Sequence, residues 1–279
     1  MVLASWLGYL FSIDEQWTRS KVLPLLDWNR DAQQARQAWD GWLNRGRWTD
    51  RLLPELIPHY KEAFSHLSLE RKEKRFRLVR HVANIAVDGL NNPLEEYDWI
   101  PSFLRTVAEE DRVAFAEWIH TLLMNMKEEK KHLWERWLKQ YWQERNQGIP
   151  VPFSDGELEK TVEWISELEP VFPEAVAVIC EGKVPHLEDV QLLYRLKKTE
   201  LSDKHPEALT RLLIHLTSDL KMLRRQCSAL EILTDRLIAA KAPANLLHKL
   251  CEQLARAGCR NAESLHGKID VRDEHSANS

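Results

Sequence analysis

The chain has 279 residues, 44% of them hydrophobic and 29% charged, which is the composition of a folded globular protein with a substantial core. Its formal net charge of −4 excludes a bulk electrostatic attraction to nucleic acid or to an anionic membrane. Only 9 glycines are present, which argues against a glycine-rich phosphate-binding architecture, whereas 12 tryptophans are an unusual enrichment.

An apolar stretch with a helical stripe, residues 2–11, opens the chain. It is short, lacks a basic region and is followed at once by acidic residues, so we expect no signal peptide. It has the pattern of a helix interior with upstream neighbours, which indicates that the natural unit begins before Met1. Ser12 and Glu15 have capping-box spacing and predict a short helix through Ser20.

Apolar residues keep a helical period beyond this point. Helices are expected over residues 31–43, from Thr49 or Asp50 onward, and over residues 69–90. Pro58 falls inside the second of these helices and predicts a kink or a break there.

The most informative stretch is residues 133–152, LWERWLKQYWQERNQGIPVP. Its large apolar side chains recur at helical spacing and predict one buried helix face: Trp134, Trp137, Leu138, Tyr141 and Trp142. Gly148 predicts a left-handed end to this helix, and Pro150 and Pro152 prevent its continuation. We expect a core helix here, with an aromatic binding platform as the alternative.

The two prolines and a capping box from Ser154 to Glu157 mark a boundary, after which helical periodicity resumes. The clearest later stripe is Leu209, Leu212, Leu213, Leu216 and Leu220. No segment alternates like a strand, so we predict an all-α fold: an irregular multi-helix bundle or α-solenoid-like array of about a dozen helices, with no sheet. The expected divisions are an N-terminal helical half (1–152), a C-terminal helical half packed on the first or continuous with it (153–260), and a flexible polar tail (261–279).

We find no motif with a known catalytic mechanism. The sequence contains no G-x-G-x-x-G, Walker lysine loop, H-E-x-x-H or G-x-S-x-G, and the histidines do not stand at ligand spacing. Carboxylates at 109–111 are expected at a helix start. Basic runs at 71–80 and 127–131 are interleaved with glutamates, which is typical of a solvated helix face. We therefore expect no catalytic residue, cofactor or metal.

The cysteines are expected to be thiols. Cys180, Cys227, Cys251 and Cys259 form no C-x-x-C pair, and no histidine pair accompanies them at zinc spacing. Buried or incidental thiols indicate a reducing compartment, so we expect a cytoplasmic protein. No apolar run approaches the length of about 20 residues that crosses a membrane, so no membrane contact is expected.

An ordered set of segments carries a family resemblance: residues 38–47, 52–60, 133–152, 171–188 and 192–216. Together they resemble the helical domain found C-terminal to sirtuin-like NAD-consuming domains in bacterial anti-phage defence proteins. The most specific piece is the pattern W-x-x-W-L-x-x-Y-W-x-x-R-x-x-G-x-P-x-P. The chain has no glycine-rich NAD pocket of the sirtuin type, so NAD cleavage is not carried over to it.

The resemblance implies a non-catalytic interaction module that senses a phage component or scaffolds a sirtuin-like effector, so a protein partner is expected. Because tryptophan and arginine are enriched at interface hot spots, the candidate contact residues are Trp39, Trp42, Trp48, Trp137, Trp142 and Arg145. Core packing is the alternative for these side chains. Two other functions stay open: an enzyme of unrecognised type, and a nucleic-acid-binding helical protein, which would need a continuous positive groove.

Overall fold

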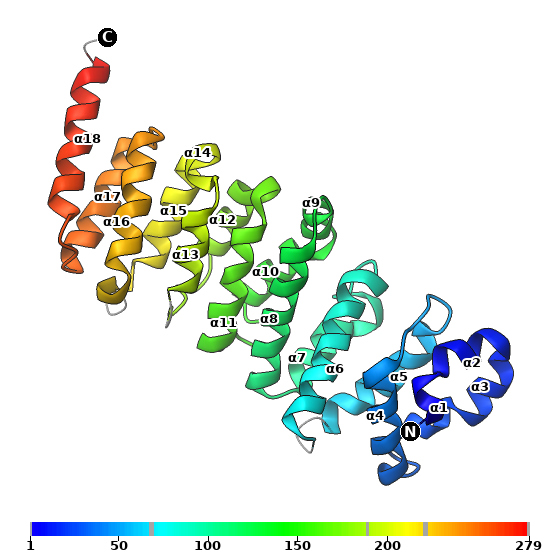
Figure 1. Cartoon of the computed structure of the whole chain (residues 1–279). Helices are drawn as coiled ribbons and strands as arrows, with labels where there is room; N and C mark the ends of the chain where they lie inside the picture. The colour runs from blue at the N-terminus through cyan, green and yellow to red at the C-terminus, as the bar shows by residue number, and fades with distance from the viewer. Residues whose placement is uncertain (1, 67–69, 188–189, 220–222, 278–279) are drawn as a thin grey trace. The chain divides into compact units, whose positions relative to one another are not determined.

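The computed structural model describes residues 2–66, 70–187, 190–219 and 223–277 as helices and their links, and no strand occurs among these residues (Figure 1). The predicted all-α class is therefore confirmed. The chain divides into two compact units, Met1–Leu122 and Leu123–Ser279.

The first unit packs short and long helices around an aromatic core. Its elements in chain order are α1 (Val2–Ser5), α2 (Leu7–Ile13), α3 (Glu15–Lys21), η1 (Leu23–Leu26), α4 (Ala32–Arg45), α5 (Leu53–His66), α6 (Lys72–Asn84), η3 (Ile85–Gly89), η4 (Glu96–Asp98), α7 (Trp99–Thr106) and α8 (Glu109–Asn125), whose last turn passes the unit boundary. Helix α1 lies against α4, α4 against α6, and α5 against α7. Large buried rings fill the core: Trp39, Trp42, Tyr60, Phe64 and Trp99.

The cap of α3 is Asp14 rather than the expected Ser12. The Asp14 carboxylate accepts a hydrogen bond of 2.8 Å from the backbone N–H of Trp17. The Ser12 hydroxyl instead donates to the carbonyl of Tyr9, inside the preceding helix α2. Because α2 runs on to Ile13, Ser12 is not free to start the next helix.

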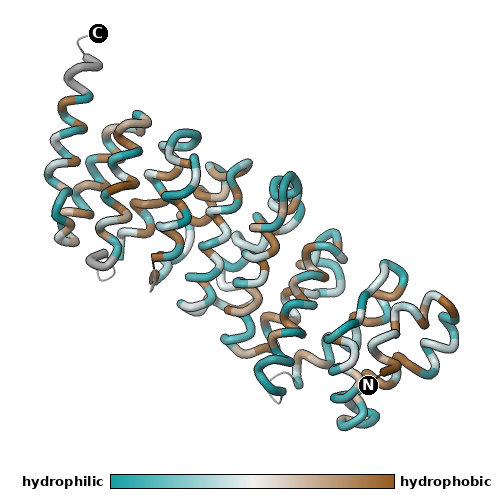
Figure 2. Tube along the Cα trace, viewed as in Figure 1, coloured by the Kyte–Doolittle hydropathy of each residue, from teal (hydrophilic) through white to brown (hydrophobic). Residues whose placement is uncertain are grey.

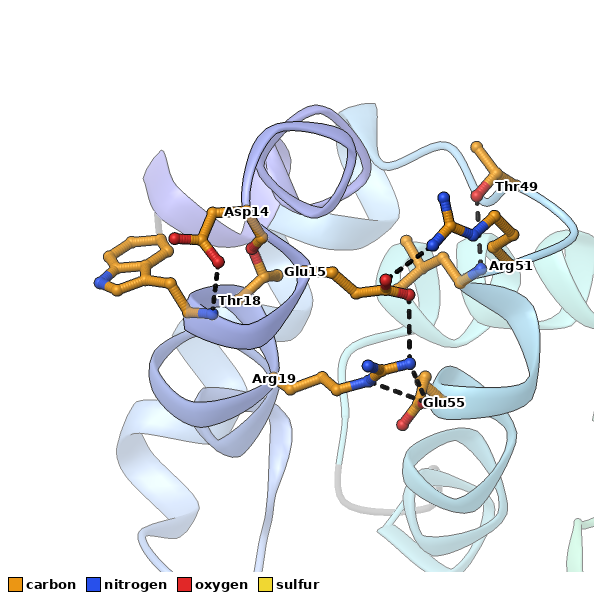
Figure 3. A network of polar contacts seen from close by, with 9 residues as sticks. Asp14, Glu15, Thr18, Arg19, Thr49, Arg51 and Glu55 are labelled. Carbon is orange, nitrogen blue, oxygen red and sulfur yellow. Dashed lines mark hydrogen bonds and ion pairs between the residues drawn. The ribbon is translucent and has the colours of Figure 1, made fainter.

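Figure 3 shows a surface network that ties α3 to the region where α5 begins. Glu15 pairs with Arg19 at 3.1 Å and with Arg51 at 2.7 Å, and Arg19 also donates to Glu55 at 3.0 Å. These side chains are between 27% and 79% exposed, so solvent screens each pair, which contributes about 1 kcal/mol or less. The network orients the N-terminal helices, whose stability must come from apolar packing.

The break expected at Pro58 does not occur, because α5 continues from Leu53 to His66. Pro58 itself is exposed, while its neighbours Leu56, Ile57 and Tyr60 are buried. A proline inside a helix costs about 3 kcal/mol, and burial of three large side chains around it exceeds that cost.

A polar chain runs through the core of the first unit. The Trp42 indole N–H donates to the Tyr60 hydroxyl at 2.7 Å, so the Tyr60 proton is available for Nδ1 of His81, 2.8 Å away. This arrangement requires an unprotonated Nδ1. Burial lowers the pKa of His81 to about 4, against the opposing effect of a hydrogen bond with the backbone of Leu43. His81 is therefore a neutral core histidine at neutral pH.

The second unit stacks its helices in two rows. Four helices contact one another in succession in the first row: α10 (Lys139–Asn146), α12 (Phe172–Cys180), α15 (Pro206–Leu216) and α17 (Ala244–Arg256). The second row is built in the same way: η6 (Glu163–Glu167), α13 (Gln191–Lys198), α16 (Leu223–Ala239) and α18 (Ala262–Ala277). Shorter elements complete the unit: α9 (Lys130–Leu133), η5 (Trp134–Leu138), α11 (Asp155–Val162), η7 (Glu169–Val171) and α14 (Leu201–Lys204). Of the two predicted arrangements, a bundle or a solenoid-like array, the stacking of this unit in two rows resembles the solenoid-like array.

The central stretch is the core helix that its sequence predicts. All five large side chains of the expected stripe are at most 1% exposed: Trp134, Trp137, Leu138, Tyr141 and Trp142. A π-helical turn, η5, carries the first three of them. Gly148 ends the helix at φ +81°, and the N–H of Ile149 donates to the carbonyl of Glu144 at 2.9 Å, which is the expected left-handed cap.

A buried ion pair joins α10 to α11. The Arg145 guanidinium donates to the Glu157 carboxylate and to the Val151 carbonyl, and the two charged side chains are 1% and 0% exposed. The Phe153 ring lies 4.2 Å from the guanidinium carbon. Because this pair spans the boundary expected at residue 152, both sides fold as one unit, and the division lies between Leu122 and Leu123 instead.

The expected flexible tail is a helix over most of its length. Helix α18 packs against α17 and α16, with Leu265 and Ile269 on its buried side at 3% and 0% exposure. Arg272 donates to the carbonyl of Ala242 at 3.0 Å. Two apolar residues one turn apart are enough to dock a helix whose other faces are polar.

Cys227 and Cys259 form a disulfide, which corrects the expectation that these cysteines are thiols. Their Cα atoms are 5.3 Å apart, and the bond links α16 to the turn that precedes α18. The partners are separated by 32 residues, so spacing along the chain offered no sign of the bond. Cys180 and Cys251 are free.

We predict that Glu157→Gln destabilises the second unit by about 3–5 kcal/mol, because Arg145 would keep its buried charge without a counter-charge. Urea unfolding followed by tryptophan fluorescence measures this change. Asp155→Asn is the matched control, since Asp155 and its partner Lys183 are 66% and 63% exposed and should contribute about 1 kcal/mol or less. Equal effects of the two substitutions would contradict the account.

A second prediction concerns pH. The His81 imidazole has an ordinary pKa of about 6.5 when unfolded and a pKa of about 4 when folded. The stability that depends on neutral His81 is therefore complete above pH 6.5 and declines by about 3 kcal/mol as the pH falls to 4 and below. Chemical denaturation between pH 7.5 and 4 should show a steeper loss for the natural chain than for His81→Gln. Exposed His132→Gln is the control, and parallel curves for all three chains would refute the prediction.

Candidate functional site

A groove of about 860 Å³ lies along three successive helices of the second unit, α12, α15 and α17. Apolar side chains contribute part of its lining: Val176, Ala177, Ala208, Ile214 and Leu246. The lining also includes charged and polar side chains: Glu181, just after α12, and Glu207, Arg211, His215, Lys249 and Gln253 on α15 and α17. An apolar lining with charges of both signs is typical of a site for an amphipathic protein segment.

The helical period of α15 places these groups. Its leucine stripe, Leu209, Leu212, Leu213 and Leu216, is buried as predicted, and Leu220 lies outside the described residues. Glu207 and Arg211 are one turn apart on another face of the same helix and form a 2.9 Å ion pair. Because the core stripe fixes the rotation of α15, both charges are directed to the groove.

Two titratable side chains that line the groove, Cys180 and His215, have pKa values shifted by burial. Burial raises the pKa of the Cys180 thiol to about 11, against the opposing effect of Arg211, so Cys180 stays protonated. Burial also lowers the pKa of His215, against a hydrogen bond with the backbone of Lys183, so its ring is neutral. Arg211 is 58% exposed at its side chain and is accessible to a partner.

A second surface feature is the apolar face of the N-terminal helices, where Figure 2 shows a hydrophobic run. Trp6, Tyr9 and Ile13 are 54%, 61% and 64% exposed. A hollow of about 400 Å³ next to them is lined by Trp6 and Tyr9 together with Arg45 and Arg47. Large exposed apolar side chains that lie together mark contact surfaces, and this one was visible in the sequence as an apolar opening helix.

The candidate contact residues taken from the sequence are mostly enclosed. Trp39, Trp42, Trp137, Trp142 and Arg145 are at most 2% exposed, so the contact surface expected from them is not accessible. Two of the buried indoles have acceptors in the core: Trp39 donates to the Leu26 carbonyl at 3.1 Å and Trp42 to the Tyr60 hydroxyl at 2.7 Å. The indole N–H groups of Trp137 and Trp142 are buried without a hydrogen-bond partner among the described residues. Trp48 alone is half-buried, with its ring 6.2 Å from that of His81. These positions agree with core packing, the alternative reading of the tryptophans.

The basic run at 71–80 is paired with acids from its own unit. Arg75 donates to Asp111 at 2.8 Å, at the start of α8, and Lys74 lies 3.0 Å from Asp40. A groove of about 520 Å³ near this run is lined by four basic and three acidic side chains: Arg36, Arg71, Lys74, Arg77, Asp40, Glu70 and Glu73. Its mixed charge differs from the continuous positive groove that a nucleic-acid-binding function would need.

One group of metal-ligating side chains was missed in the sequence. His248, His266 and Asp270 come within reach of a single ion, and they are the group of this kind found among the described residues. His266 and Asp270 stand four residues apart, which is ligand spacing on a helix. This spacing does not predict a metal site when residues 261–279 are expected to be flexible, because ligand spacing has meaning only on a helix.

The fold defines this chain as an all-α protein whose second unit is an array of stacked helices. Residues 85–254 match the family model described as Domain of unknown function (DUF4020), and the chain belongs to this family. The matched region contains every residue that lines the 860 Å³ groove. No curated protein and no solved structure matches the chain. In the described part of the chain, every helix is too short or too polar to cross a bilayer.

Proposed function

We propose that this chain is a non-catalytic helical interaction module whose groove on α12, α15 and α17 binds an amphipathic segment of a protein partner. The observation that carries the proposal is the groove itself, with apolar side chains beside Glu207, Arg211 and Lys249 on successive helices. Stacked helices commonly use such an extended face for recognition. The charges would set the register of the bound segment, and the apolar lining would supply most of the affinity.

The proposed biological setting is a bacterial anti-phage defence system, in which the module senses a phage component or scaffolds a sirtuin-like NAD-consuming effector. The support is the sequence resemblance, above all the pattern that begins at Trp134 and ends at Pro152. Trp134, Trp142 and Arg145 from this pattern build the core next to α12, which forms one wall of the groove. The pattern would thus preserve the frame of the groove rather than touch the partner.

We predict that the double variant Arg211→Glu/Lys249→Glu lowers the amount of sirtuin-like effector that co-purifies with the chain at least tenfold. Two rim charges worth about 0.7 kcal/mol each would account for this loss. The same variant should lower protection of cells from phage when both genes are expressed. Lys198→Glu/Arg260→Glu reverses two exposed charges of the same unit away from the groove and is the matched control.

Two results would contradict this function. One is equal co-purification and protection for the groove variant and its control. The other is turnover of NAD by the purified chain alone, which would make it an enzyme.

We also propose a cytoplasmic location, which the disulfide puts to the test. A reducing cytoplasm would hold Cys227 and Cys259 as thiols, although their Cα separation of 5.3 Å permits the bond. Rapid acid quenching of cells, followed by alkylation before any reductant is added, tests the location, because a chain kept in a reducing compartment would be labelled at both cysteines. Unlabelled, bonded cysteines in freshly quenched cells would place the chain in an oxidising compartment.

A further inference from the structure

Three potential metal ligands meet where the last two helices of the second unit pack together. His248 lies on α17, and His266 and Asp270 lie one turn apart on α18. Nδ1 of His248 is 3.1 Å from Nε2 of His266, and Nδ1 of His266 is 3.3 Å from Asp270. Nε2 of His248 is 3.7 Å from the same carboxylate. One ligand atom from each residue lies within 4.8 Å of the others.

Each imidazole can offer one ring nitrogen to a single ion, so the separation that applies to one ligand atom from each residue is the limit of 4.8 Å, and the side chains must move together by about 1 Å to bind an ion. Zn²⁺ binds imidazole nitrogen and carboxylate oxygen at about 2.0–2.2 Å, so ligand atoms around a tetrahedral ion stand roughly 3.3 Å apart. The three side chains are 30%, 44% and 54% exposed, so an ion can enter from solvent and the rings can adjust. Without an ion, two facing ring nitrogens must share one proton, since only one of them can donate.

We propose that His248, His266 and Asp270 form a binding site for a divalent transition-metal ion of the Zn²⁺ class. Two imidazoles favour Zn²⁺, Co²⁺, Ni²⁺ or Cu²⁺ over Mg²⁺ and Ca²⁺, which prefer sites made of oxygen ligands alone. The three residues leave at least one coordination position open. A depression of about 240 Å³ adjoins His266 and is lined also by Glu252 and Glu263, so water or one of these carboxylates can complete the set.

The bound ion would fasten α18 to α17. Helix α18 is otherwise held by the disulfide at the turn before it, a narrow apolar stripe, the contacts of Arg272 and exposed pairs such as Lys268 with Asp235. Exposed pairs contribute little, so a metal bridge would add to the buried contacts and the disulfide that hold this helix. The inference is independent of the protein-binding function, because none of the three ligands lines the groove on α12, α15 and α17.

The test uses the full-length chain after dialysis against EDTA and then against metal-free buffer. Isothermal titration with Zn²⁺ should give one site per chain with a dissociation constant in the micromolar range. Bound Co²⁺ should show d–d absorption bands in the visible spectrum. Titration with Mg²⁺ at the same concentrations should give no heat of binding. The thermal unfolding midpoint should rise with added Zn²⁺, as expected for an ion that binds the folded state alone.

Variants then assign the ligands. His266→Ala and Asp270→Asn should each weaken Zn²⁺ binding at least tenfold and remove the thermal shift, whereas the exposed histidine variant His132→Ala should bind like the natural chain. Circular dichroism establishes that each variant is folded. If His266→Ala unfolds, the test rests on Asp270→Asn, because asparagine has nearly the same shape as aspartate. Zn²⁺ binding that is unchanged in both ligand variants overturns the proposal. So does the absence of binding by the folded natural chain at about 100 micromolar Zn²⁺.

Discussion

The second unit depends on one ion pair that has no access to water. Removing a guanidinium and a carboxylate from solvent costs several kcal/mol for each ion, so Arg145 and Glu157 are tolerable in the core only together. Their contact fixes α11 against α10, and the Trp142 ring then meets Phe153 and Trp164 from the following segment. Helix α12 packs on α10 and forms one wall of the groove. The Arg145–Glu157 pair therefore supports that wall although neither residue lines the groove.

Stacking in two rows explains why this unit has a continuous solvent-exposed helix face. Each helix buries one stripe on its neighbour in the row and another on the opposite row, which leaves a third face for solvent. On α12, α15 and α17 these remaining faces line up as the groove. At the end of the stack, α17 and α18 bring together two histidines and an aspartate from separate helices. Both surface sites are thus consequences of the stacking.

Much of the fold could be predicted because it follows from local patterns. The stripe at Trp134, the left-handed end at Gly148 and the Ser154 cap, whose hydroxyl accepts from the Glu157 N–H, are all properties of short segments. Each rests on the helical period or on backbone stereochemistry, which need no knowledge of distant residues.

The sites could not be predicted in the same way, because they are formed by residues far apart in the chain. Tryptophan enrichment does not distinguish a core from a contact surface, so the sequence predicts contact roles for Trp39 and Trp137 although both are buried. The disulfide of Cys227 with Cys259 joins α16 to the turn before α18, and the contact of His248 with His266 joins α17 to α18. The apolar side of α18 has only two large residues, Leu265 and Ile269. The polar residues around them predict a flexible segment more strongly than these two predict a packed helix.

The central claim, that the second unit is held together by a mutually dependent buried pair, is tested most directly by a double-mutant cycle. Arg145→Met and Glu157→Leu are made singly and together, and the free energy of unfolding is measured for each chain. Our account predicts that each single change destabilises by about 3–5 kcal/mol and that the double variant loses no more than either, because both charges have left the core together. Additive losses within about 0.5 kcal/mol would mean that the two side chains act independently, and would contradict the account.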